Sequence, residues 1–306
     1  MAKTAFLFAG QGAQTVGMTR DLYDNFSVVR ETFSQASQIL GYDLRHLIDT
    51  EPEKLHQTAY TQPAILTSSV AIYRLLKEHQ KTPDMVAGLS LGEYSALVAS
   101  EAISFEDALR LVAKRGQFMA EATPAGSGKM VAVMNTDAQL IEQVCQEASE
   151  KGVVSPANYN TPGQIVIGGE TEAVNRAVEL LKAKGVKRLI ALNVSGPFHT
   201  ALLESASQKL ALELAKVTFS PFAIPLVGNT EAKVMEHDRI ADLLVRQVME
   251  PVRFYDSVAT LKDKGVERMV EIGPGKVLTG FVKKIDKALP CQSIEDMASL
   301  RLFLEK

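Results

Sequence analysis

The sequence feature that most constrains the fold is a G-x-S-x-G pentapeptide at residues 88–92, between a short apolar run and a helical pattern. Residues 84–87 are expected to form a strand, and residues 93–99 the start of a helix. A serine on such a tight turn is lifted clear of the backbone, because the flanking glycines let the chain bend without side-chain clashes. The amide after it then points to where a tetrahedral oxyanion would form. The pattern favours Ser90 as the nucleophile of an acyl transfer, and an ordinary glycine turn is the alternative.

The rest of the chain alternates between apolar runs and helical periodicity. Expected strands cover residues 3–9, 224–228 and 266–272, and expected helices cover residues 20–40, 62–80, 101–121, 201–216 and 240–249. This alternation predicts an α/β fold, with an α/β-hydrolase-like larger domain built on a parallel sheet.

A different order interrupts this alternation after the loop 123–128. Its expected strands are residues 129–134, 153–157, 164–167 and 186–194, and its expected helices run from a capping box at 136–139 to Gly152 and over 171–184. Residues 158–163 are expected to be a turn-rich linker. The order βαββαβ is ferredoxin-like. A length of 306 residues is typical of a protein with about two domains. We predict a discontinuous larger domain, formed by residues 1–125 and 197–306, with a ferredoxin-like α+β subdomain inserted at residues 126–196.

Two patterns that resemble phosphate loops are incomplete. The turn Gly10-x-Gly12 has Thr15 where a dinucleotide fingerprint needs its third glycine. Two Gly-Lys pairs, at 128–129 and 275–276, lack the Ser or Thr that would hold magnesium. A net charge of −3 does not favour nucleic acid as a partner. Binding of nucleotides or nucleic acid is therefore not expected.

The cysteines and apolar runs predict a cytoplasmic protein without membrane contact. Cys145 and Cys291 cannot form a disulfide framework or a cysteine-rich metal site, and they suit a reducing compartment. The apolar run 5–9 is too short for a signal-peptide core, and no later run is long enough to span a membrane.

Only one of the five histidines is placed to act as a base for Ser90. His199 follows an expected strand and the break 195–198, at the carboxyl edge where α/β folds place their sites. It is also C-terminal to the serine, as in α/β-hydrolases. We predict His199 as the general base, with a core or loop histidine as the alternative. The other four are expected on the solvated surface, without metal-ligand spacing: His46, His56, His79 and His237.

The remaining parts of an acyl-transfer site are less well defined by the residues. No Asp follows a strand between Ser90 and His199 in the larger domain, so an amide or backbone carbonyl is expected to orient the imidazole. Gln11 lies in a glycine-rich turn and is a candidate for a second oxyanion donor, with a plain turn residue as the alternative. Arg115 suits bidentate recognition of a carboxylate, although its neighbours alone favour a surface arginine with a packed stem.

Taken together, these motifs resemble the malonyl-CoA:acyl carrier protein transacylases of type II fatty acid synthesis. The matching segments run in chain order along the whole sequence: GQGAQ at 10–14, SLGEYSAL at 90–97, SPANYN at 155–160, GPFH at 196–199, LVRQ at 244–247 and EIGPGKVL at 271–278. One position departs from the family pattern, since Leu89 stands where the family usually has His immediately before the serine. This removes a polar neighbour of Ser90.

The resemblance implies a role for each site residue. Ser90 would be the nucleophile, His199 the base, and Arg115 the partner of the malonyl carboxylate. The other implied roles are oxyanion N–H groups from Gln11 and Leu91, an imidazole-orienting carbonyl from Gln247, and an acyl pocket lined by Phe198 and Asn160.

The implied reaction moves malonyl from malonyl-CoA to the phosphopantetheine thiol of acyl carrier protein, through a malonyl-serine ester and with ping-pong kinetics. No bound cofactor or metal is expected, and the site is expected between the subdomain and the larger domain. A thioesterase and a non-enzymatic carrier-protein-binding module are the alternatives. The basic pairs at 187–188 and 283–284 are candidates for meeting an acidic carrier protein, or are simply solvated surface charges.

Overall fold

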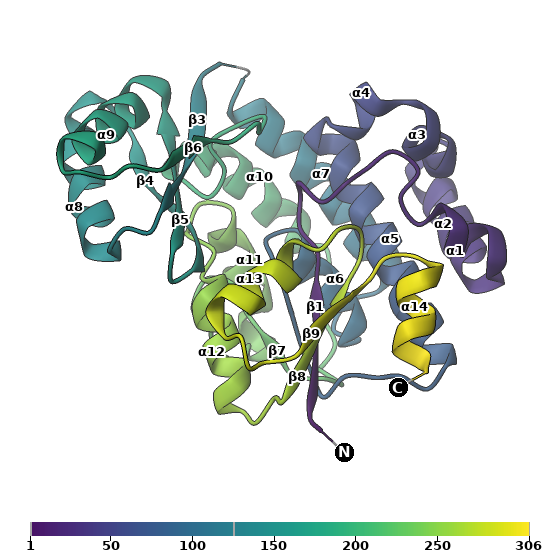
Figure 1. Ribbon diagram of the computed structural model, residues 1–306. Coiled ribbons are helices and arrows are strands. Elements are labelled where there is room, and N and C mark those ends of the chain that lie inside the picture. The colour runs from purple at the N-terminus through teal and green to yellow at the C-terminus, as the bar shows by residue number, and fades with distance from the viewer. Residues whose placement is uncertain (1, 125, 306) are drawn as a thin grey trace.

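The computed structural model describes residues 2–124 and 126–305, and its strands form two separate sheets (Figure 1). In the first sheet all strand pairs are parallel and the order is β7-β2-β1-β8-β9. Its strands are β1 (Thr4–Phe8), β2 (Met85–Gly88), β7 (Leu226–Val227), β8 (Arg268–Ile272) and β9 (Cys291–Ile294). Phe8 pairs with both Gly88 and Ile272, so β1, β2 and β8 end together at one edge.

Alternate residues of the parallel sheet enter two different cores. Phe6, Phe8 and Val86 pack on one side, and Ala5 and Leu7 on the other. The first core is completed by α2 (Ser27–Leu40), α5 (Thr58–Glu78), α6 (Gly92–Ala99), α7 (Phe105–Ala122), α10 (Glu204–Leu214) and α11 (Ile240–Gln247), and the second by α12 (Phe254–Asp263) and α13 (Val277–Ile285). Burial on both faces explains why these strands are continuous apolar runs.

Shorter helices complete the larger part of the molecule. They are α1 (Arg20–Asn25), α3 (Leu44–Thr50), α4 (Pro52–Leu55) and α14 (Met297–Leu304), together with the 3-10 turns η2 (Ala201–Leu203) and η3 (His237–Arg239). His46 therefore lies within a helix, although no regular element was expected around it.

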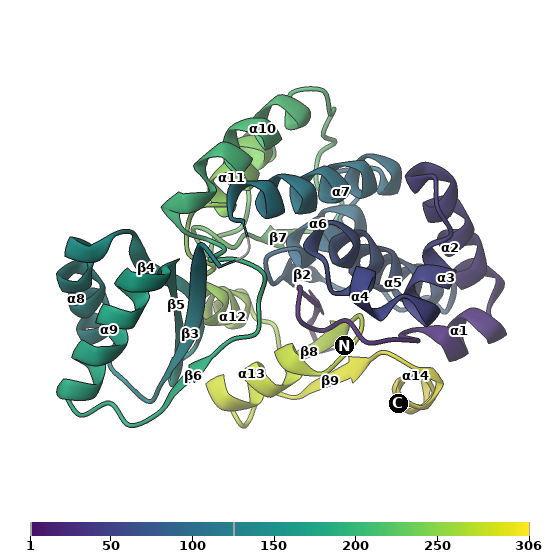
Figure 2. The same cartoon turned by 90° about the horizontal axis from the view of Figure 1, so that it is seen from above.

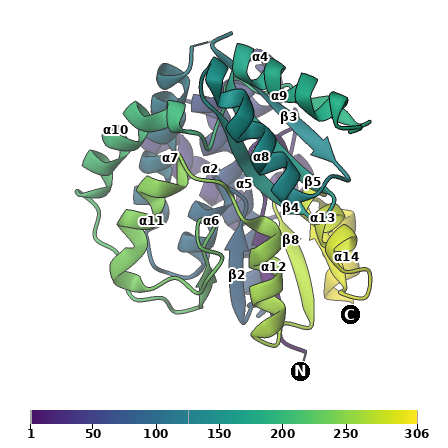
Figure 3. The same cartoon turned by 90° about the vertical axis from the view of Figure 1, so that its left-hand side faces the viewer.

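The second sheet is antiparallel and has the order β4-β5-β3-β6. Its elements follow the predicted βαββαβ order: β3 (Gly128–Met134), α8 (Ala138–Ala148), η1 (Ser149–Lys151), β4 (Val154–Thr161), β5 (Gln164–Glu170), α9 (Thr171–Ala183) and β6 (Leu189–Ala191). Helices α8 and α9 cover one face of this sheet (Figure 3), where Val131, Val133 and Ile167 form a core of their own. The opposite face is turned toward the larger part of the molecule (Figure 2), and there Met130 and Val166 join the core of the larger sheet.

The structure confirms the predicted α/β class and the ferredoxin-like order, and it corrects several element limits. Strand β4 continues to Thr161, so the expected linker 158–163 is mostly strand, with only Pro162-Gly163 left as the turn. The Pro and Asn residues that suggested a loop can be accommodated in β4 because it is an edge strand with β-bulges. Strand β6 covers only Leu189–Ala191 of the expected 186–194.

Two helix starts also differ from the prediction. Helix α5 begins at Thr58, which places Pro63 inside it and not at its start. The N-cap of α8 is Asp137 and not Thr136, because its carboxylate accepts hydrogen bonds from two first-turn amides. The predicted domain limits stay a prediction, and the limit at residue 125 lies outside the described residues.

Candidate active site

The G-x-S-x-G pentapeptide forms a sharp turn between β2 and α6. Ser90 takes a φ of 53°, a strained conformation for a residue with a side chain. A Cβ on Gly88 would overlap the Gly92 backbone, and a Cβ on Gly92 would overlap the Phe8 carbonyl. Glycine is therefore required at both positions because the strand, the turn and the helix pass so close to one another. The turn leaves Ser90 partly exposed, as expected for a nucleophile.

The structure brings Ser90 and His199 into hydrogen-bond contact. The distance from Ser90 Oγ to His199 Nε2 is 2.8 Å, and the distance from His199 Nδ1 to the backbone carbonyl oxygen of Gln247 is 2.6 Å. Since a carbonyl can only accept, Nδ1 carries the proton and Nε2 is free to accept from the serine hydroxyl. A backbone carbonyl thus occupies the orienting position for which no Asp was found.

The environment of His199 favours its neutral form. The side chain is buried, and burial together with the nearby Arg115 charge lowers the pKa of His199 to about 4, with the Gln247 carbonyl acting in the opposite direction. At neutral pH the imidazole is therefore unprotonated, which is the state that a general base requires.

Arg115 is buried, contrary to the surface position that its neighbours favoured. It is 1% exposed, and its guanidinium donates to the side-chain oxygens of Gln62 (2.9 Å), Gln247 (2.9 Å) and Ser90 (3.2 Å). Burial lowers its pKa. Within residues 2–124 and 126–305 no carboxylate forms an ion pair with it, and its Nε has no hydrogen-bond partner. A buried guanidinium without an acidic partner is suited to receive a carboxylate from a ligand.

Ser90, His199 and Phe198 line a pocket of about 500 Å³ between the two sheets. The larger sheet and its helices contribute Gln11, Gly12, Gln14, His56, Leu89, Met119, Val277 and Phe281. The four-stranded sheet and the segment after it contribute Met130, Ala132, Asn158, Asn160, Gln164, Val166, Leu192, Asn193, Val194 and Ser195. The expected site between the subdomain and the larger domain thus corresponds to this pocket. His56 is exposed as predicted, yet it lies on the pocket rim.

One candidate oxyanion donor directly follows the serine, and the other lines the same pocket. The first is Leu91, and the second is Gln11, which lies in the turn after β1. In the part of the chain that the structure describes, neither backbone N–H donates to a protein acceptor. The Gln11 side chain is held in place, because its Nε2 donates to Thr58 Oγ1 at 3.0 Å. Both amides are therefore available to a substrate oxygen.

The two candidate acyl-pocket residues lie on different walls. Phe198, 8% exposed, precedes the base and packs against the larger core. Asn160 is on β4, where its Nδ2 donates to Gln164 Oε1 at 3.1 Å. Its buried Oδ1 has no hydrogen-bond partner among the described residues.

Leu89 takes part in apolar packing beside the nucleophile. Its side chain is partly buried against the core that contains Ala87 and Phe254, and it also lines the pocket. The position that usually carries a histidine in the family thus presents an apolar surface in this chain.

Three residues that the sequence reasoning did not single out are bound into this site. Asn229 Oδ1 accepts from the Ser90 backbone N–H at 2.7 Å, and its Nδ2 donates to the Gly88 carbonyl at 2.6 Å. Glu93 accepts from Asn229 and Gln247, and Gln62 accepts from Arg115. Asn229 follows β7 at the same sheet edge as the serine, and the edge rule applied to His199 could have found it.

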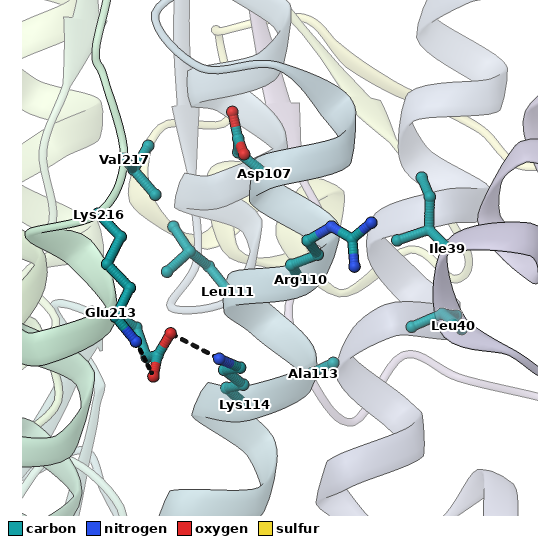
Figure 4. Close-up of a pocket in the computed structure, with 10 residues that line it drawn as sticks. All are labelled: Ile39, Leu40, Asp107, Arg110, Leu111, Ala113, Lys114, Glu213, Lys216 and Val217. Atoms are coloured by element: carbon teal, nitrogen blue, oxygen red, sulfur yellow. Dashed lines mark hydrogen bonds and ion pairs between the residues drawn. The ribbon is translucent and has the colours of Figure 1, made fainter.

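A second hollow, of about 420 Å³, lies on the surface between α2, α7 and α10 (Figure 4). Three of its charged side chains pair with one another, since Glu213 contacts Lys114 at 2.6 Å and Lys216 at 3.0 Å. None of the predicted site residues lines it. We therefore assign the chemistry to the pocket that contains Ser90.

Neither a metal-binding cluster nor a membrane-spanning helix is found among the described residues. Over the described ranges, no three His, Cys, Asp or Glu side chains are grouped so that they could hold a metal ion. No helix described by the structure combines the length and the apolar character needed to cross a membrane.

An elbow serine beside a neutral histidine, over a parallel sheet, defines an acyl-transferring α/β enzyme, and comparisons with known proteins specify the family. The acyl transferase domain model matches residues 5–302. A malonyl CoA-acyl carrier protein transacylase of Escherichia coli O157:H7 is 49% identical over 308 residues, covering 100% of both chains. The crystal structure of MCAT from Streptococcus pneumoniae is 67% identical, with a TM-score of 0.97 and 99% of each chain covered.

A further solved structure contains a type II PKS acyl-carrier protein, AntF, in complex with its malonyl-transacylase, PlMCAT. That transacylase is 45% identical to this chain, with a TM-score of 0.97 and 99% of each chain covered. The chain belongs to the malonyl CoA-acyl carrier protein transacylase family.

Proposed function

We propose that Ser90 carries the malonyl group in the reaction of this chain, which is the transfer of malonyl from malonyl-CoA to the phosphopantetheine thiol of acyl carrier protein for fatty acid synthesis. The observation that carries this assignment is the 2.8 Å contact between Ser90 Oγ and the unprotonated Nε2 of His199. The buried, carboxylate-free Arg115 lies 3.2 Å from the same oxygen. Nucleophile, base and anion site therefore converge on one atom.

In the first half-reaction Ser90 Oγ attacks the thioester carbonyl carbon, and its proton passes to His199 Nε2. The resulting oxyanion receives hydrogen bonds from the backbone amides of Gln11 and Leu91. The carbon–sulfur bond then breaks, and the proton on His199 passes to the sulfur of coenzyme A. A malonyl-serine ester remains on the enzyme.

In the second half-reaction the phosphopantetheine thiol gives its proton to His199, and its sulfur attacks the ester carbonyl. The carbon–oxygen bond breaks, and Ser90 regains its proton. Throughout both steps the Gln247 carbonyl keeps the proton on His199 Nδ1, and Arg115 pairs with the free carboxylate of the malonyl group.

We propose further that the chain uses no bound cofactor and acts in the cytoplasm. Each step above moves only an acyl group and a proton, so the side chains and amides already named suffice. Cys145 and Cys291 are both free thiols, which suits a reducing compartment.

The test is the intact mass of the protein after mixing with malonyl-CoA, and again after adding phosphopantetheinylated acyl carrier protein. We expect a malonyl adduct on Ser90 that disappears as malonyl-carrier protein forms. Rapid release of free malonate without an acceptor thiol would instead indicate a thioesterase. An unchanged mass would indicate a carrier-binding module without catalysis.

A further inference from the structure

A buried carboxylate lies one turn after the nucleophile and has no role in the steps above. Glu93, in the first turn of α6, is 1% exposed. Its Oε1 accepts from the backbone N–H of Asn229 at 2.7 Å, and its Oε2 accepts from Gln247 Nε2 at 2.6 Å. In the described part of the chain no cationic side chain forms an ion pair with it. Burying a carboxylate without an ion-pair partner is costly, so its presence requires an explanation.

The two residues that Glu93 holds are those that fix the reacting groups. The backbone carbonyl of Gln247 orients His199. In the side chain of Gln247, Oε1 accepts from Arg115, and Nε2 also donates to the Ser90 carbonyl at 2.9 Å. The Asn229 side chain binds the Ser90 amide. The serine, the histidine and the arginine are therefore each linked to this one carboxylate by a path of two hydrogen bonds.

The geometry fits the ionised form of this carboxylate. Both of its oxygens face N–H donors, which a carboxylate satisfies and a protonated carboxyl group does not. Burial raises the pKa of Glu93 to about 7, while the two donors and the charge of Arg115 act in the opposite direction. The positive end of α6 adds to the stabilisation of a negative charge in its first turn.

We propose that Glu93 is a positioning residue for the acyl transfer: its carboxylate fixes Gln247 and Asn229, and through them the Ser90–His199 pair and the Arg115 guanidinium. This inference rests on the proposed roles of those residues. Glu93 itself touches no reacting atom. Its contribution is the alignment of the serine and the base, to which rates are very sensitive.

The test is Glu93→Gln, a change that keeps the volume and replaces one acceptor oxygen with an NH₂ group. That NH₂ must face either the Asn229 N–H or the Gln247 NH₂, so one of the two contacts becomes donor against donor. We expect the single-turnover rate of Ser90 acylation to fall about 10- to 100-fold. The rate should fall with both malonyl-CoA and acetyl-CoA, because both reactions need the same serine–histidine alignment. The KM for each thioester should change little.

Glu271→Gln is the matched control. Glu271 is the other fully buried carboxylate among the described residues, and it accepts from the amides of Leu278 and Thr279 at 3.0 and 2.7 Å, outside the network around Ser90. We expect this variant to melt at a lower temperature but to acylate within about threefold of wild type. If the role of Glu93 were only structural, both variants would melt at a lower temperature and would lose acylation rate to the same small extent. Acylation of folded Glu93→Gln at the wild-type rate, or an equal loss in Glu271→Gln, overturns the proposal.

If Glu93→Gln does not fold, Glu93→Asp replaces it, since aspartate keeps the charge and both acceptors on a shorter stem. A slowed acylation in the folded Asp variant supports positioning, and a wild-type rate contradicts it. Mapping the wild-type adduct first separates this inference from the proposed function: an adduct away from Ser90 would refute the latter whatever the Glu93 variants do.

Discussion

The wall of the pocket from the larger part of the molecule carries the reacting groups, tied together by buried hydrogen bonds, whereas the wall from the four-stranded sheet has no charged side chain. We call the first the polar wall and the second the apolar wall, after Met130, Ala132 and Val166, although the second also includes uncharged amides such as Asn160. At the first wall Ser90, His199 and the buried Arg115 are joined by contacts of 2.6–3.2 Å, either directly or through the side chain and backbone of Gln247. On the second wall Met130, Ala132 and Val166 present side chains without charge. The difference indicates that chemistry is confined to one wall, while the other wall supplies shape.

The two walls also differ in how their backbone is built. The reactive turns follow parallel strands that end in register, so small shifts between them would break several ladder hydrogen bonds. Strand β4, in contrast, is an edge strand with two register shifts. It is attached to the larger part through the Tyr159 amide, which donates to the Val252 carbonyl at 2.8 Å, and through the Val252 amide, which donates to Ala157. Mutations on the polar wall should therefore affect the rate and the recognition of the free carboxylate, and mutations on the apolar wall should affect how well the substrate fits.

The largest effect is expected from Ser90→Ala on the polar wall. The variant should form no malonyl adduct, and turnover should fall by roughly four orders of magnitude or more, as the loss of a nucleophile does. Intact mass and peptide mapping after malonyl-CoA check this. A malonyl adduct that maps to another residue of the variant would refute the assignment of Ser90.

The second-largest effect is expected from Arg115→Ala, which tests whether the polar wall also selects the substrate. Because only malonyl offers a free carboxylate, malonyl transfer should lose on the order of 2–5 kcal/mol more than acetyl transfer. Acetyl transfer should also decline, since Arg115 contacts Ser90 and Gln247. The measurement is kcat/KM for both thioesters in wild type and variant. Equal losses would mean that Arg115 is structural.

The same contrast explains what could be predicted from the sequence. Ser90 and its turn were recognisable because their signal is local: two glycines, a strand before and a helix after. His199 was recognisable because its place after a strand sets its place at the sheet edge. The burial of Arg115 was not predictable from its neighbours, because it depends on Gln62 and Gln247, which are 53 and 132 residues away along the chain.

The apolar wall was harder to predict for a related reason. Its strand β4 contains Asn and Pro residues typical of a loop, and only pairing with β5 makes it regular. Asn160 was therefore expected in a linker but lies in a strand that faces the pocket. Similarly, Glu93 and Asn229 contact each other 136 residues apart, and nothing local in either segment indicates that contact.

Phe198→Ser should have a moderate effect, because this residue lies beside the base but contributes shape and no charge. We predict that Phe198 lies near the malonyl C2 carbon, so that a methyl group there would press against its ring at a cost of about 1–3 kcal/mol in a packed pocket. Removing the ring should raise methylmalonyl transfer relative to malonyl transfer and lower the overall rate. The ratio of the two kcat/KM values measures this. An unchanged ratio in a folded variant would assign Phe198 to core packing alone.

Asn160→Ala, on the apolar wall, should have the smallest effect. Asn160 lines the pocket, and its buried Oδ1 has no partner among the described residues, so we expect this oxygen to accept a hydrogen bond when a substrate is bound. A hydrogen bond of this kind contributes about 0.5–1.5 kcal/mol, so kcat/KM for malonyl-CoA should fall between about twofold and tenfold, mainly through KM. Tyr159→Phe is the matched control, because the neighbouring side chain faces the other side of β4, where its hydroxyl contacts Glu142 in α8. We expect the control to keep the wild-type KM. A fall in kcat as large as that of Glu93→Gln would contradict the division of labour between the two walls, because it would place a rate-determining contact on the apolar wall.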